Sequence, residues 1–65
     1  MVSIERHTHS FIIKIWLEEE PREEHEGVWR GQITEVNTRE RRYLHELSDI
    51  ITYIKPYLEE WGVRA

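Results

Sequence analysis

The amino-acid sequence predicts an α+β domain, in which a three-stranded antiparallel β-meander is followed by one C-terminal α-helix packed on one face (β-β-β-α). Residues 47–61 place apolar side chains at intervals of three and four, the period of one helical face. Two upstream runs, at 9–18 and 27–36, are rich in β-branched and aromatic residues. Only short connections separate the strands, whereas parallel pairing needs a long crossover, so we expect antiparallel pairing. All 65 residues are expected to form a single small domain.

The first strand is expected over residues 9–18, and side chains alternate between the faces of a strand. A helix is the competing interpretation, and it is disfavoured because four of the seven residues from Phe11 to Leu17 are Ile or Trp. One face is then wholly apolar and is expected to meet the core, and it consists of Phe11, Ile13, Ile15 and Leu17. The other face is mixed and consists of Ile12, Lys14, Trp16 and Glu18. A charged stretch at 18–26, with Pro21 inside it, is expected to be a solvated loop.

The second strand is expected over residues 27–36. Trp29 and Ile33 share the core face with Gly31, which has no side chain and would let a helix or a large neighbour approach the sheet. The opposite face carries Arg30, Gln32, Thr34 and Val36.

A polar turn at 37–40 predicts a hairpin into a short third strand at 41–45. Leu44 is expected to face the core, and Arg41 and Tyr43 are expected to point to the opposite face.

The helix is expected to begin near Glu46 or Ser48 and to end at Gly62, a residue type common just beyond a helix. Asp49 in the first turn suits the positive end of the helix dipole. Pro56 removes one backbone hydrogen bond inside the helix. Since the apolar stripe stays in phase on both sides of this proline, we predict one bent helix. The stripe expected to face the sheet consists of Leu47, Ile50, Ile51, Ile54, Leu58 and Trp61.

One helix can cover only one face of the sheet, so the opposite face is the candidate interaction surface. Such apolar patches on small proteins tend to mark interaction sites, and Trp, Tyr and Arg are enriched at interface hot spots. The candidate interface or ligand residues are Ile12, Lys14, Trp16, Arg30, Gln32, Arg41 and Tyr43.

Two functions compete for this surface. In the first, two copies associate through the open face or edge of the sheet and form a homodimer. In the second, the basic and aromatic side chains bind nucleic acid or another anionic ligand. Nine Lys and Arg residues against thirteen Asp and Glu residues give a net charge of −4, which disfavours nucleic acid. The cations can also simply neutralise neighbouring glutamates and protect the sheet from aggregation.

Chemistry-bearing motifs are weak. His7 and His9 would place two imidazoles on one face of a strand, a spacing that can chelate a metal, but two ligands do not make a site. No serine has a base at a recognisable spacing, and no glycine-rich loop could cradle a phosphate. We therefore expect a protein that is not an enzyme and that needs no cofactor.

Size and composition favour association. A chain this short buries only roughly 60% of the surface that its unfolded form exposes. The sequence has no cysteine, so disulfides and zinc–thiolate sites are excluded. No apolar run approaches the roughly 20 residues of a membrane span, and the N-terminal residues contain no signal-peptide core, so we expect a cytoplasmic protein and no membrane partner.

Several segments together resemble a group of short bacterial proteins of unknown function. They are HSFIIKIWLE at 9–18, WRGQIT at 29–34, RRYL at 41–44, and the pattern Ile-x-x-Tyr-Ile-x-Pro-Tyr-Leu at 50–58. The resemblance covers nearly the whole chain. The group carries Pro-Ser-Gly or a similar sequence where this chain has Asn37, Thr38 and Arg39. Since the group has no assigned activity, the resemblance implies no catalytic or binding residue.

Overall fold

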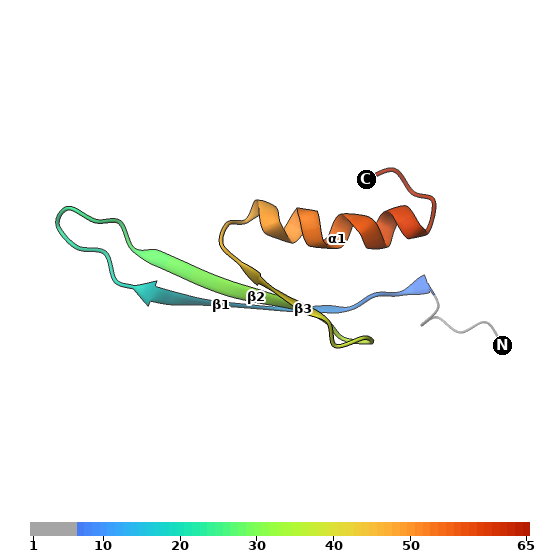
Figure 1. Ribbon diagram of the computed structural model, residues 1–65, viewed down its shortest axis with the longest axis horizontal. Coiled ribbons are helices and arrows are strands. Elements are labelled where there is room, and N and C mark those ends of the chain that lie inside the picture. The colour runs from blue at the N-terminus through green and yellow to red at the C-terminus, as the bar shows by residue number, and fades with distance from the viewer. Residues whose placement is uncertain (1–6) are drawn as a thin grey trace.

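The computed structural model describes residues 7–65 as a three-stranded sheet followed by one helix (Figure 1). The strands are β1 (Phe11–Glu19), β2 (Val28–Glu35) and β3 (Arg41–Leu44), and the helix is α1 (Ser48–Glu60). Both strand pairs are antiparallel, and the order in the sheet is β1-β2-β3. The predicted β-β-β-α fold is confirmed.

Cross-strand pairing defines two faces of the sheet. Ile13 lies opposite Ile33, and Ile15 lies opposite Gly31, which in turn pairs with Leu44. Phe11 belongs to this face and contacts the rings of two helix residues, Tyr53 and Tyr57. We call it the helix-side face, and we call the reverse the open face. The predicted alternation of β1 between two faces is confirmed. The prediction that this whole face meets the core is wrong, because only Phe11 lies under the helix, whereas Ile13, Ile15 and Leu17 are exposed.

Strand bounds differ slightly from the predicted ones at the start of β1. The backbone N–H of Val36 donates to the Ser10 carbonyl, and residue 36 then enters the β2–β3 turn. The ladder therefore ends at Ser10, and residues 7–9 have no strand beside them within the described residues. His7 and His9 therefore precede β1 and do not lie on it, contrary to the prediction.

Hydrogen bonds close the β2–β3 turn tightly. The Glu35 N–H donates to the Glu40 carbonyl at 2.8 Å, and the Arg39 N–H donates to the Glu35 carbonyl at 2.8 Å. Arg39 has φ +66°, a left-handed conformation that glycine adopts more readily. The turn is thus a defined hairpin with arginine at position 39, where the positive φ favours glycine.

The helix runs without interruption across Pro56, so the prediction of a single helix is confirmed. At its C-terminal end Gly62 has φ +78°, its N–H donates to Glu59, and the N–H of Val63 donates to Leu58. This pair of bonds is the Schellman arrangement, and it confirms the predicted stop.

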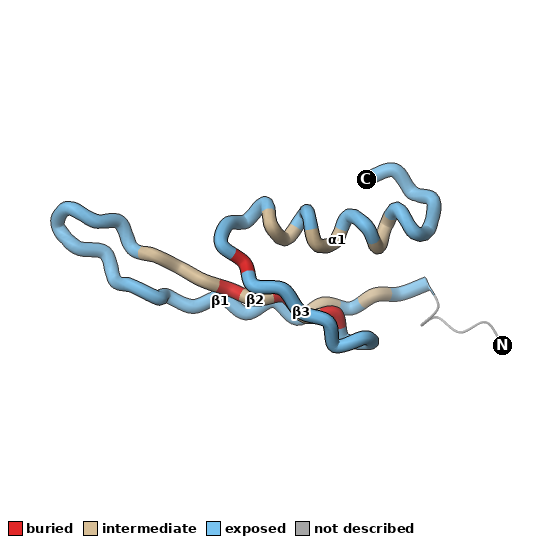
Figure 2. The backbone as a smooth tube through the Cα atoms, in the orientation of Figure 1, coloured by how far each residue is buried: buried red, intermediate tan, exposed pale blue. Residues whose placement is uncertain are grey.

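The helix covers only one end of the sheet (Figure 1). It starts above the middle of the β1–β2 hairpin and runs away from the C-terminal half of β1, so the distal half of the hairpin has no helix above it. Figure 2 shows the consequence, since most of β1 and the outer part of α1 are exposed. The buried residues of the described part are Gly31, Ile33, Glu35 and Leu44.

The prediction that the whole apolar stripe of the helix faces the sheet is wrong. The helix is rotated about its axis so that Tyr53 and Tyr57 rest on Phe11. Leu47, just before the helix, is 70% exposed, and Ile51 is 68% exposed. Aromatic contacts near the C-terminal end of the helix set this rotation, and a period of 3.6 residues does not reveal them.

The molecule is elongated. Its extents are 58 × 22 × 13 Å, and its radius of gyration is 15.6 Å. A compact domain of this length is expected to have a radius of gyration of about 11 Å. Within residues 7–65, no helix is long and apolar enough to cross a membrane.

Candidate functional site

The seven predicted interface residues all lie on the open face. Together with Thr34 they form three cross-strand rows, which are Ile12–Thr34–Arg41, Lys14–Gln32–Tyr43 and Trp16–Arg30. Because side chains directly opposite each other in an antiparallel pair are neighbours, these rows bring basic and aromatic groups together on one surface.

Two members of this surface already have partners. The indole Nε1 of Trp16 donates to the Glu18 carboxylate at 2.7 Å, and the Arg30 guanidinium donates to the Trp29 carbonyl at 3.0 Å. Lys14 and Arg41 form no hydrogen bond or ion pair through their side chains within the described range 7–65. Their charges are therefore available to a partner.

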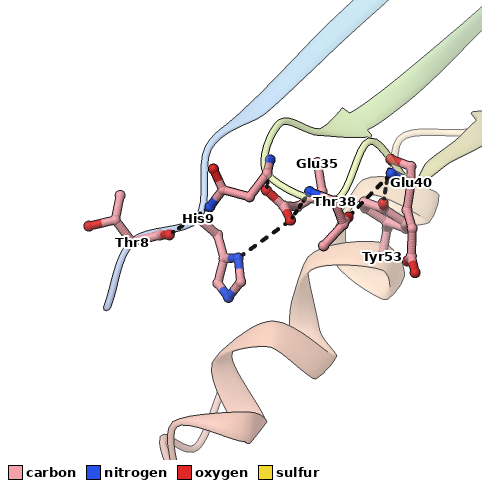
Figure 3. A network of polar contacts seen from close by, with 7 residues as sticks. Thr8, His9, Glu35, Thr38, Glu40 and Tyr53 are labelled. Atoms are coloured by element: carbon pink, nitrogen blue, oxygen red, sulfur yellow. Dashed lines mark hydrogen bonds and ion pairs between the residues drawn. The ribbon is translucent and has the colours of Figure 1, made fainter. Parts of the chain in front are cut away.

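On the other face, Glu35 is a fully buried carboxylate that the sequence analysis did not single out (Figure 3). Its two oxygens accept the backbone N–H groups of Asn37 at 2.7 Å and Thr38 at 3.1 Å. Burial by itself raises the pKa of Glu35, but these hydrogen bonds and the nearby His9 outweigh it and lower the pKa below 4.5. The carboxylate thus orders the β2–β3 turn as an acceptor.

His9 connects this carboxylate to the helix. Its Nδ1 is buried, lies 3.8 Å from Glu35 Oε2, and has no hydrogen-bond partner among residues 7–65. Its ring stacks on Trp61 at a centroid distance of 5.3 Å and meets the edge of Tyr57 at 4.6 Å. The residue that the sequence offered as a metal ligand is thus part of an aromatic cluster made of His9, Phe11, Tyr53, Tyr57 and Trp61.

Tyrosine hydroxyls complete this polar network. Tyr53 Oη donates to the Glu40 carbonyl at 3.0 Å, which ties α1 to the β2–β3 turn (Figure 3). The side-chain hydrogen bond with Tyr53, together with burial, raises the pKa of Tyr57 to about 12. Tyr57 therefore stays neutral far above physiological pH, and it acts as a packing residue here.

An open groove of about 560 Å³ lies between β3 and α1, and Arg42, Asp49 and Tyr53 are among its lining residues. Asp49 is its acidic group at the start of the helix, but the carboxylate accepts the backbone N–H groups of His45 and Glu46. The hydrogen bond from the His45 N–H, and to a lesser extent the one from the Glu46 N–H, lower the pKa of Asp49. The carboxylate is thus occupied in shaping the β3–α1 connection.

Metal-ligating residues are dispersed in the described part of the chain. Between residues 7 and 65, no three His, Cys, Asp or Glu side chains lie close enough together to hold a metal ion. His7 is exposed, whereas His9 is directed toward Glu35.

Comparisons with protein families, with curated proteins and with solved structures gave no match to this chain. The functional argument therefore rests on the geometry of the chain itself.

Proposed function

We propose that this protein is a small, non-enzymatic interaction protein of the cytoplasm that self-associates as a homodimer through its sheet. The supporting observation is the amount of surface that a single copy exposes. Its accessible surface is 5936 Å². A compact folded monomer of 8.0 kDa is expected to expose about 4,450 Å².

The excess is about 1,500 Å² per copy, relative to that scaling. If two copies buried this excess against each other, the interface would cover about 3,000 Å² in total, which is within the range of obligate homodimers. Ile33 and Leu44 alone make up the buried apolar core of residues 7–65. So small a core favours a protein whose folding is completed by association.

The polar side chains support a role without catalysis. Glu35 and Asp49 are engaged with backbone N–H groups in a turn and at a helix start. A general acid or base must instead be free to exchange a proton with a substrate.

The test is the mass of the protein in solution at micromolar concentration, by light scattering or sedimentation. We expect twice the chain mass of 8.0 kDa. A single species of 8.0 kDa across the micromolar range would refute the proposal.

A second candidate function is the binding of nucleic acid or another anionic ligand to the open face. It is supported by Lys14 and Arg41, which lie unpaired near Trp16 and Tyr43. A single-stranded oligonucleotide titrated at low salt would then quench tryptophan fluorescence, and added salt would reverse the effect. No quenching at high micromolar oligonucleotide would refute this alternative.

A further inference from the structure

Strand β1 has the composition of a strand inside a sheet, although it lies at an edge. Strands buried on both faces are near-continuous apolar runs, whereas exposed edges are usually short or carry charges. Phe11 to Leu17 contains one charged residue, Lys14. Ile12 and Trp16 are exposed on the open face, and Ile15 and Leu17 are 68% and 57% exposed on the helix-side face. From Ile12 to Leu17, both faces and the outer edge of this strand therefore lack cover within residues 7–65 of a single copy.

The outer edge of β1 also presents backbone hydrogen-bonding groups. Val36 donates to Ser10, and bonded and non-bonded pairs alternate along antiparallel strands, so Ile12, Lys14 and Trp16 exchange hydrogen bonds with β2. The N–H and C=O groups of the alternate residues, Ile13 and Ile15 among them, then point away from β2. They form a row that another strand can pair with.

The helix supplies an apolar flank on the same side of the molecule. The flank of α1 that contains Asp49 and Tyr53 borders the groove beside β3. On the opposite flank an apolar surface is formed by Ile50, Ile51, Ile54 and Leu58. Exposed Leu47 lies at its N-terminal end. Since β1 and β3 are the two edges of the sheet, this flank is on the side of α1 away from β3.

We propose that the occupant of this edge is a second copy of the chain, with β1 paired antiparallel to β1 of the partner in one six-stranded sheet. This inference rests on the proposed self-association and assigns its surface. A two-fold axis through β1 reverses the partner, so the half of β1 that its own helix leaves bare lies beside the helix-bearing half of the other copy (Figure 1). The apolar flank of each helix then covers Ile15 and Leu17 of the other copy.

The register of this pairing is restricted by Lys14. Side chains keep their faces when the axis passes through a residue, and the residues at the centre of β1 (Phe11–Glu19) are Lys14, Ile15 and Trp16. An axis at Lys14 places two ammonium groups directly opposite each other, which is destabilising. An axis at Ile15 places Lys14 opposite the partner's Trp16, and an axis at Trp16 places it opposite the partner's Glu18. Both of these pairs are favourable.

Amide hydrogen exchange of the unmodified protein tests the pairing directly. In a single copy, β2 protects the amides of Ile12, Lys14 and Trp16 only. Pairing through β1 also protects Ile13 and Ile15, so we expect these two amides to exchange as slowly as their neighbours. A dimer in which Ile13 and Ile15 exchange fast would overturn the β1 assignment while leaving self-association intact, whereas a monomer would overturn both.

Cysteine crosslinking identifies the axis, because the natural chain has no cysteine. Residues on the axis come within disulfide range, and residues one position away do not. We expect oxidation to crosslink either Ile15→Cys or Trp16→Cys, with Lys14→Cys as the matched control that stays uncrosslinked. Crosslinking of Arg42→Cys on β3, with none in β1, would overturn the proposal.

A pair of charge substitutions separates the edge from the open face. Ile15→Lys places a charge beneath the partner's helix, and we expect it to halve the mass in solution while circular dichroism remains folded. Tyr43→Glu changes an exposed residue of the open face on β3, away from the β1 edge, and we expect the dimer to persist. The reverse pattern, in which only Tyr43→Glu dissociates, would transfer the interface to the open face.

Discussion

Glu35 combines a full negative charge with complete burial, and the backbone around it explains how. The N–H groups of Asn37 and Thr38 solvate its two oxygens within one tight turn. Alternation places residue 35 on the helix-side face, where an acidic residue conflicts with an apolar pattern. An acidic residue at an apolar position, with Asn37 and Thr38 two and three residues later, is the signal by which sequence analysis could have found it.

The lowered pKa of Glu35 links this residue to the acid stability of the protein. Because the folded pKa lies below 4.5, the unfolded chain binds the proton more readily. The stabilisation is therefore complete above about pH 4.5 and is lost as pH falls through the folded pKa.

Glu35→Gln tests this account. The amide NH₂ cannot accept a hydrogen bond from a backbone N–H, so we expect lower stability at pH 7 and a weaker dependence between pH 6 and pH 3. Urea unfolding at both pH values measures the effect, and Glu24→Gln in the exposed loop is the matched control. Equal acid dependence in Glu35→Gln and the natural chain would contradict the account.

Arg39 stands at the position of the same turn that requires a positive φ. A non-glycine residue in the left-handed region carries a conformational cost that glycine avoids. We expect Arg39→Gly to stabilise the fold by about 1 kcal/mol, measured by urea unfolding. Arg41→Gly, at a strand position, is the control and should destabilise. A loss of stability in Arg39→Gly would show that the arginine side chain contributes to the turn.

At the scale of elements, the strands were predictable to within two residues, and the rotation of the helix was not. Successive side chains of a strand point to opposite faces because of the backbone pleat alone, so the sequence identified the two faces of the sheet. The sequence also indicated a close approach at Gly31, where an added Cβ would lie 2.8 Å from the Lys14 carbonyl oxygen. The side chains that come close are those of Trp29, from the same strand, and Ile15, from β1, each 3.2 Å away. The rotation of α1 depends on ring contacts between segments distant in sequence.

Pro56 is the weak point of α1, because it leaves the Thr52 carbonyl without its helical donor. We expect Pro56→Ala to increase helix content and to stabilise the fold by up to about 3 kcal/mol. Far-ultraviolet circular dichroism and thermal unfolding measure the two effects, with Lys55→Ala as the neighbouring control. A lower melting temperature would mean that the aromatic cluster needs the helix geometry that proline imposes.

At the scale of the whole molecule, stability and association are expected to be one property. If folding is completed by a second copy, mass action makes the melting temperature depend on concentration. We expect it to rise steadily from low to high micromolar protein in calorimetry. Ile15→Lys should melt lower and without this dependence. A melting temperature independent of concentration in the natural chain would contradict an obligate dimer.

The sequence by itself determined the element order, the antiparallel pairing, the two faces of each strand and the grouping of the seven candidate residues on the open face. Each of these follows from local periods and short connections along the chain. Tertiary structure alone decided that α1 covers one end of the sheet, that His9 joins the aromatic cluster, and that β1 remains uncovered. These features arise from contacts between distant segments, which local patterns do not encode.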